Sequence, residues 1–221
     1  MRKIFLMTIV LLAVSLMSFS VVARDVCWHG FLWNIEQESG GLTAKMENNQ
    51  FIVDGTSESG NWSAKVIASA TPRTLNSVSA DISVDSEGSE SSSAIAINDG
   101  DIIISVGKHF NNMYPEWNTD CAVSSSRHGL IYSGPKNPTN DFSNYKVVIT
   151  ENGFEAYCDN ELVATITTPI NQEKNINLRT GIAHSNNAIH TTYKNLRVNN
   201  EVINFGEVNS NNVCFLPIGF H

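Results

Sequence analysis

The chain has 221 residues and a formal net charge of −8 at pH 7. An acidic surface repels nucleic acid and anionic membranes, which argues against both as partners but is compatible with neutral glycans, cations and basic proteins. Only 16% of the residues are charged, and Ser, Thr and Asn are frequent. This composition favours a folded, exported β-protein with one core over a disordered chain.

The first 23 residues predict a secretory signal peptide. Arg2 and Lys3 precede a long apolar run, and Val-Val-Ala before Arg24 suits cleavage after Ala23. The alternative is a retained membrane anchor. Since no later segment is apolar and long enough to span a bilayer, we expect a secreted or periplasmic protein with no membrane span after cleavage. Residues 24–221 would then form a single domain.

Short β-rich runs follow one another along the rest of the chain, and helical periodicity is almost absent. Gly, Asn, Asp, Ser or Pro divide the runs at intervals of about ten residues. Such spacing without intervening helices is typical of a sandwich or barrel. Outside a regular meander at 144–166, the predicted strands are 50–55, 62–70, 77–86, 93–98, 101–107, 129–134, 175–185 and 191–200.

Two segments are predicted to be irregular. The first, DSEGSESSS at 85–93, is acidic and rich in Ser, which indicates a solvated loop. The second, 108–140, contains one predicted strand and otherwise turn-forming residues, and loops of that length are usually functional or pinned. Asn-Asp-Gly-Asp at 98–101 is predicted to be a hairpin turn. Its oxygens also make calcium a candidate cofactor, although the spacing is not that of an EF-hand.

The four cysteines predict two disulfides, because an even number in an exported chain favours pairing. Three pairings are open. We favour Cys27–Cys214, because the terminal strands of a sandwich are often neighbours, together with Cys121–Cys158. A zinc site is the alternative, but neither a CxxC nor a His-Cys spacing supports it.

The segment NYKVVITENGFEAYCDNELVATI, residues 144–166, predicts three strands joined by two tight turns. Asn152-Gly153 suits a type I′ turn, and Asp159-Asn160 suits a similar one. In that register Ile149 faces Ala156, Val147 faces Cys158, and Cys158 faces Glu161 across the second turn.

One face of this predicted meander is continuously apolar and is assigned to the core: Tyr145, Val147, Ile149, Phe154, Ala156, Cys158 and Val163. The other face is mixed, and includes Lys146, Val148, Thr150, Glu155, Tyr157, Leu162, Ala164 and Ile166. The mixed face is either half-covered or a surface for a ligand.

This meander resembles that of the concanavalin A-like jelly rolls, which include laminin G-like domains, legume-type lectins and several glycan-degrading enzymes. The matching residues are Tyr-Lys-Val-x-Ile, Asn-Gly, and Phe-x-Ala-Tyr-Cys-Asp-Asn-x-Leu-Val. RTGIAHSNNAIHTTYKNLRV at 179–198 is similar to the late strand pair of the same superfamily. The resemblance implies an all-β, two-sheet antiparallel jelly-roll sandwich, and its motifs specify the fold more than a function.

Catalytic motifs are hard to find in this sequence. The resemblance implies that a glycan hydrolase would carry Glu-x-Asp-x-Glu on one strand, and no such strand is present. Asp85, Glu87 and Glu90 are the nearest cluster, and a solvated loop accounts for them. His184 and His190 could meet across a turn and bind a metal, but a third ligand is not identifiable.

Sugar recognition is better supported, because sugars are bound by aromatic faces and by polar groups that reach their hydroxyls. Trp117, flanked by Pro and Glu, is expected to be exposed, although a loop Trp can also plug the end of a core. The candidate binding residues in the long segment are Tyr114, Trp117, Asp120, Arg127, His128 and Tyr132.

We therefore hypothesise an exported, non-catalytic recognition module that binds glycan at a cell surface or in a matrix. One alternative is a glycan-cleaving hydrolase or lyase with the same fold. The other is an adhesion or structural module that binds protein.

Overall fold

The computed structural model describes residues 24–28, 31–58, 63–72, 74–87, 90–135, 137–171, 174–183, 186–199 and 201–202. The predicted signal peptide lies outside these residues. The described elements are β-strands, apart from one turn of 3-10 helix, η1 (Pro115–Trp117). Within the described part of the chain, no helix is long and apolar enough to cross a membrane.

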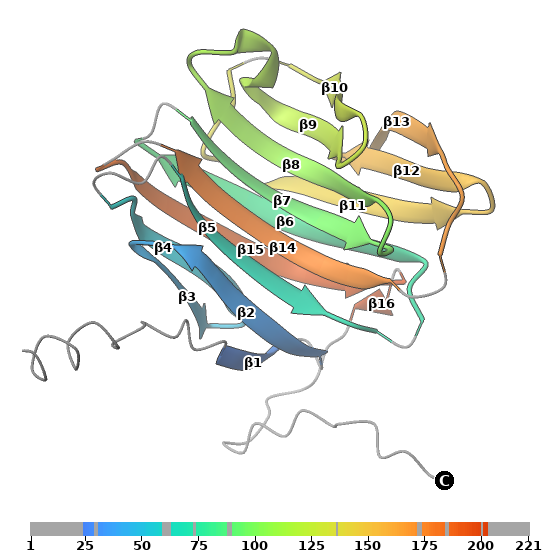
Figure 1. Ribbon diagram of the computed structural model, residues 1–221, viewed down its shortest axis with the longest axis horizontal. Helices are drawn as coiled ribbons and strands as arrows, with labels where there is room; N and C mark the ends of the chain where they lie inside the picture. Colours follow the sequence, from blue (N-terminus) through green and yellow to red (C-terminus); the bar gives the residue numbers. More distant parts are fainter. Residues whose placement is uncertain are drawn as a thin grey trace, which may run out of the picture.

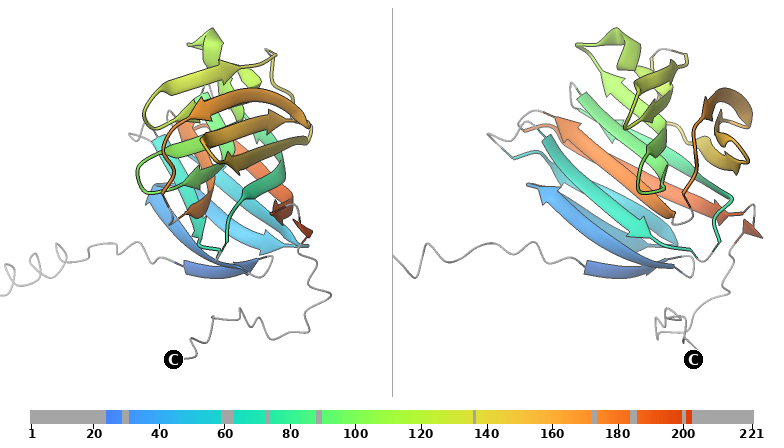
Figure 2. Two further views of the ribbon diagram at one scale, coloured as in Figure 1. Left: turned by 90° about the vertical axis from the view of Figure 1, so that its right-hand side faces the viewer. Right: turned by 45° about the vertical axis from the view of Figure 1, so that its right-hand side comes forward.

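Two antiparallel sheets pack face to face, with β8 of one sheet over β11 of the other (Figures 1 and 2). The first sheet consists, in spatial order, of β1 (Arg24–Trp28), β2 (Phe31–Ser39), β5 (Ser63–Ala70), β14 (Asn175–Ala183), β7 (Glu90–Asn98), β8 (Ile103–Asn111), β9 (Thr119–Ser125) and β10 (Gly129–Ser133). The second consists of β13 (Glu161–Thr167), β12 (Gly153–Cys158), β11 (Ser143–Thr150), β6 (Ser77–Ser86), β15 (Ala188–Val198), β4 (Gln50–Thr56) and β3 (Leu42–Glu47), with β16 (Glu201–Val202) on β15. The predicted jelly-roll sandwich is confirmed.

The core lies between the two sheets and is built by alternation along each strand. In β7, for example, Ile95 and Ile97 are fully buried between the sheets. The largest buried side chains include Trp33, Phe51 and Phe154. Burial of each such side chain stabilises the fold by roughly 1.5–3 kcal/mol.

A hydrogen-bonded polar network crosses this core. Ser93 Oγ lies 2.8 Å from Thr191 Oγ1 and 3.3 Å from Thr180 Oγ1. Thr180 Oγ1 lies 2.8 Å from the hydroxyl of Tyr193, which donates to the carbonyl oxygen of Arg179 at 2.8 Å. Burial raises the pKa of Tyr193, so its hydroxyl stays protonated as a donor. The network thereby joins β7 and β14 of the first sheet to β15 of the second.

In the meander, one predicted turn is confirmed and the other is wrong. Asp159 and Asn160 have φ values of 48° and 70°, and Cys158 pairs with Glu161. The first turn instead consists of residues 151–152, because Thr150 pairs with Gly153. Gly153 has a φ of 151°, and a Cβ there would lie 1.9 Å from the carbonyl oxygen of Ile166. This glycine serves the contact with β13, and not the turn.

The true register differs from the predicted one by two residues, so the faces of β11 and β12 are unchanged. The predicted core residues Tyr145, Val147, Phe154, Ala156 and Cys158 are buried. On β13 the assignment fails, because the register shifts between Ala156 and Tyr157. This bulge pairs Ile166 with Phe154 and buries it, whereas Val163 is only half-buried.

The two predicted irregular segments contain more strand than expected. β6 runs to Ser86 and β7 begins at Glu90, so the predicted loop at 85–93 is wrong over most of its length. Its serines alternate, and Ser91 and Ser93 are buried, because their small side chains fit between the sheets. In the long segment, β8 extends to Asn111 and β9 is an additional strand.

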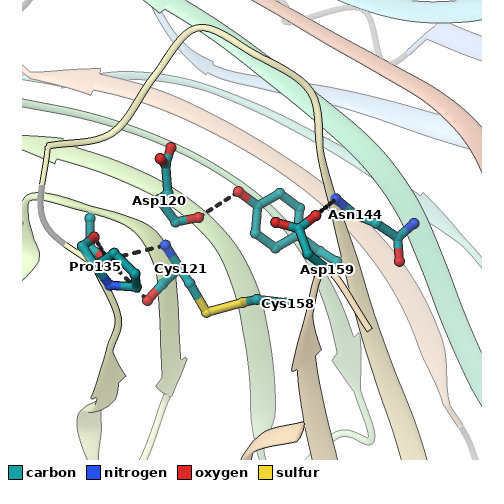
Figure 3. The surroundings of a disulfide bond; sticks show 8 residues. Asp120, Cys121, Pro135, Asn144, Cys158 and Asp159 are labelled. Atoms are coloured by element: carbon teal, nitrogen blue, oxygen red, sulfur yellow. Dashed lines mark hydrogen bonds between the residues drawn. A yellow bond between two sulfur atoms is a disulfide. The ribbon is translucent and has the colours of Figure 1, made fainter. Parts of the chain in front are cut away.

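The predicted disulfide Cys121–Cys158 is confirmed (Figure 3). It joins β9 of the first sheet to β12 of the second. Beside it, the hydroxyl of Tyr145 donates to the carbonyl oxygen of Asp120. The other predicted pair, Cys27–Cys214, lies outside what the structure describes, since Cys214 and the side chain of Cys27 are not among the described parts.

Replacing Cys121 and Cys158 together with Ala should lower the free energy of unfolding by about 2–4 kcal/mol, because the bond closes a long loop in the unfolded chain. Urea denaturation of the variant and of the wild type measures this. An unchanged midpoint would contradict the assigned stabilising role.

Tyr193→Phe should lower the free energy of unfolding by about 1–3 kcal/mol, because it removes the buried hydroxyl that donates to the Arg179 carbonyl and one of the two partners of the Thr180 hydroxyl. Tyr157→Phe is the matched control. Its hydroxyl bonds to Glu155 on the surface, so the expected change is within about 0.5 kcal/mol. Equal losses in the two variants would show that the buried network is not special.

Candidate binding pocket

A pocket of about 220 Å³ lies on the outer face of the first sheet. Strands β5, β14, β7, β8 and β9 contribute its lining, together with Trp117 of η1. The lining residues are Lys65, Val66, Ile67, Ser92, Ala94, Ser105, Gly107, Lys108, His109, Trp117, Ala122, Ser124, Arg179, Thr180 and Gly181.

Small side chains form the floor of the pocket. Arg179, Ala94, Gly107 and Ala122 are register partners in one row across β14, β7, β8 and β9. Because three of these residues are Ala or Gly, the sheet surface is hollow there. At Gly107, a Cβ would lie 2.1 Å from the carbonyl oxygen of Ser93, so β7 and β8 can approach this closely only with glycine.

His109 and Trp117 form one wall. Their ring centroids lie 5.0 Å apart at 61°, an edge-to-face arrangement. The turn that carries Trp117 is fixed by Asn111, whose Oδ1 accepts hydrogen bonds from the backbone N–H groups of Met113 and Tyr114. Burial lowers the pKa of His109 from 6.5 to about 4, so its ring is neutral at pH 7.

Arg179 and Lys65 stand on the opposite side of the pocket. Arg179 is half-buried, and within the described residues its guanidinium forms neither an ion pair nor a hydrogen bond. Among the lining residues that the structure describes there is no Asp or Glu. On the same face, Glu90 lies two positions along β7 from Ser92, outside the lining. The described lining therefore combines aromatic, hydroxyl and cationic groups.

The structure places Trp117 in the pocket and distributes the other sequence-predicted binding residues elsewhere. Tyr114 is 55% exposed. Arg127 and His128 are exposed in the turn between β9 and β10, and Tyr132 is half-buried against the core.

Asp120 has structural contacts. Its Oδ1 accepts a hydrogen bond from the backbone N–H of Thr139 at 2.9 Å and lies 3.2 Å from the ammonium of Lys108. That ammonium is fully buried and also donates to the carbonyl oxygens of Thr139 and Asp141. Asp120 and Lys108 thus fasten the segment after β10 to the sandwich.

The candidate metal positions also have other partners. Asp99 is buried, and its Oδ1 accepts hydrogen bonds from the backbone N–H groups of Asp101 and Ile102 within the predicted hairpin turn. Its Oδ2 accepts one from the N–H of Asn171. His184 is outside the described residues. In the part of the chain that is described, no cluster of three or more His, Cys, Asp or Glu could hold a metal.

A second polar constellation lies on the outer face of the other sheet. His190 Nδ1 bonds to Asp54 Oδ1, and Nε2 lies 3.1 Å from the hydroxyl of Thr192. The order carboxylate, imidazole, hydroxyl is that of nucleophilic enzymes. Thr192 is only 6% exposed, so its hydroxyl is poorly placed to attack a substrate. We therefore assign these hydrogen bonds a structural role between β4 and β15.

The sequence matches no family model and no curated protein, but solved jelly-roll structures are similar to the fold. A Bacteroides ovatus GH16 protein of a mixed linkage glucan PUL, in complex with a product, has a TM-score of 0.54 at 8% identity, over 80% of this chain and 97% of that one. A Bacillus licheniformis β-glucanase has a TM-score of 0.52 at 13% identity, over 75% and 90%.

A GlcNAcα1-4Gal-releasing endo-β-galactosidase from Clostridium perfringens has a TM-score of 0.48 at 13% identity, over 79% of this chain. The present chain spans 61% of the length of that protein. At 8% and 13% identity, the two likenesses with TM-scores above 0.5 establish the fold and nothing finer.

The low pKa of His109 predicts a pH-dependent stability. Below about pH 6.5 the unfolded chain binds a proton at His109, whereas the folded chain binds it only near pH 4. The free energy of unfolding should therefore fall as the pH is lowered through this window, by an amount on the order of 3 kcal/mol. His109→Gln should remove this part of the pH dependence.

Urea denaturation between pH 7 and pH 4, with and without the substitution, measures the difference. NMR titration of the His109 ring provides the direct value, and Trp117→Ala should move it towards 6.5 by admitting water. Parallel stability profiles for the wild type and His109→Gln would contradict the assignment.

Proposed function

We propose that this chain, which has the jelly-roll fold of the concanavalin A-like superfamily, binds carbohydrate without cleaving it. The pocket on the outer face of the first sheet is the proposed site. The observation that carries the proposal is the lining itself, which pairs an aromatic wall with hydroxyl groups and, among the described residues, includes no carboxylate.

The lining suits a sugar ring. Trp117 and His109 offer apolar ring surface to the C–H groups of a sugar, and the hydroxyls of Ser92, Ser105 and Ser124 are available for its polar groups. The small floor residues leave room for a flat ligand over the strands.

The described part of this lining, which holds no carboxylate, also argues against hydrolysis at this place. Glycoside hydrolysis normally requires two carboxyl groups on either side of the scissile bond. The acidic cluster noted in the sequence is dispersed: Asp85 accepts a hydrogen bond from Asn140, and Glu87 lies on the connection between β6 and β7. Neither lines the pocket.

A glycan-cleaving enzyme is the second candidate, because two of the similar folds carry glucanase or GH16 names. Release of reducing ends or of unsaturated products from a panel of polysaccharides would favour it. The third reading, a protein-binding adhesion module, predicts that binding to cells survives enzymatic removal of glycans.

An exported location is part of the proposal. The Cys121–Cys158 disulfide supports an oxidising compartment, and the apolar leader at 1–23 has the composition of a signal peptide. Detection of the mature chain, beginning at Arg24, outside the cytoplasm would test it.

Trp117→Ala should weaken glycan binding by roughly 10- to 100-fold, because it removes the stacking surface of the pocket. A glycan array identifies ligands, and calorimetry measures their affinities. Tyr114→Ala is the matched control, since this exposed aromatic lies three positions away and does not line the pocket. An array on which no glycan binds would contradict the carbohydrate proposal. Equal losses of affinity in Trp117→Ala and Tyr114→Ala would indicate that the glycan binds outside the pocket, near Tyr114.

A further inference from the structure

We propose that the pocket selects an acidic saccharide, whose carboxylate or sulfate group is bound by Arg179. This inference rests on the proposed carbohydrate binding and specifies the class of ligand for the same site.

The first argument is the charge of the lining, which is opposite to that of the chain. The protein has 22 acidic and 14 basic residues, yet the described part of the lining includes Lys65, Lys108 and Arg179 and no Asp or Glu. The ammonium of Lys108 is turned inward and bound by Asp120 and two carbonyls. Among the described lining residues, Arg179 is therefore the cation whose side chain is left for a ligand.

The second argument is the state of Arg179. A half-buried charge without a partner is unfavourable, because part of its hydration is lost and no ion pair or hydrogen bond replaces it. Its neighbours in the row are Ile67 and Ala94, and apolar surroundings strengthen any charge interaction made there. A guanidinium offers a planar pair of donors that matches a carboxylate or a sulfate. A bound anion would supply the missing partner.

The third argument is that Arg179 is held in place before any ligand arrives. Its carbonyl oxygen accepts the hydrogen bond of Tyr193, and Thr180, the next residue, belongs to the same buried network. The backbone at Arg179 is therefore anchored to both sheets. A fixed backbone lowers the ordering cost of binding.

The arrangement also orients the ligand. Arg179 is on β14 and His109 is on β8, two strands away, which corresponds to about 10 Å at ordinary strand spacing. An acidic group at Arg179 would leave the sugar ring over Ala94 and Gly107, with its far side towards His109 and Trp117. Arg179 would thus bind the acidic group, and the rings of His109 and Trp117 would contact the sugar ring.

The test compares saccharides that have the same sugar backbone and differ in whether they carry an acidic group. Calorimetry would use oligogalacturonate against its methyl ester, and sulfated against unsulfated galacto-oligosaccharides. In at least one pair, the acidic member should bind 10-fold or more tightly than its uncharged partner. The two pairs distinguish a carboxylate from a sulfate.

Arg179→Gln should weaken binding of the preferred acidic probe by 10- to 100-fold and leave the uncharged partner within about 2-fold, as expected for charged hydrogen bonds. Arg197→Gln is the matched control, because it changes the net charge equally at an exposed position on the second sheet. It should leave all affinities unchanged. Arg179→Lys, which keeps the charge but loses the planar donor pair, should give an intermediate affinity.

Urea denaturation must first show that Arg179→Gln folds as the wild type does; if it does not, the comparison of Arg179→Lys with wild type decides the matter. The inference would be overturned if the acidic and uncharged members of both pairs bound with equal affinity and if substitution of Arg179 left these affinities unchanged. The carbohydrate proposal would still stand in that case. If no saccharide in the array or in either pair binds, both fail.

Discussion

The alternation of side chains along the central strands of the first sheet is the constraint on which both the core and the pocket depend. On β14, Thr180 points inward to the buried network, while Arg179 and Gly181 line the outer face. On β7, Ser93 is buried and its neighbours Ser92 and Ala94 line the pocket. Alternate residues of each strand therefore face the opposite sheet and the solvent. A shift of the pairing by one residue would exchange the core-facing and the pocket-facing side chains.

The end of the sandwich near β9 is secured by chemistry other than apolar packing. The Cys121–Cys158 bond joins the sheets, and the adjacent Asp120 receives the buried ammonium of Lys108. A buried charge of this kind requires well-placed partners, since an unpaired one is strongly destabilising. The segment that carries Trp117 begins and ends in this fastened region, which explains how a short irregular stretch can present a defined wall.

The fold was accessible from the sequence because alternation and turn residues are local signals, as at Asp159 and Asn160. The site was accessible only in part. Trp117 could be singled out by its flanking Pro and Glu, but Arg179 could not, because its role depends on β14 lying between β5 and β7, which no local pattern encodes. The register of the first turn was predicted wrongly for a related reason. Gly153 is required by the close approach of β13 and not by the turn, and a local pattern does not show that approach.

Gly107 connects the depth of the pocket to the cohesion of the sheet. A side chain at this position would fill the hollow and at the same time collide with the backbone of β7. Gly107 consequently cannot be replaced by even a slightly larger residue, since a methyl group there would disturb the pairing of β7 and β8. Diversification of ligand preference in proteins built this way must come from the walls, where Trp117 lies on η1 and takes no part in strand pairing.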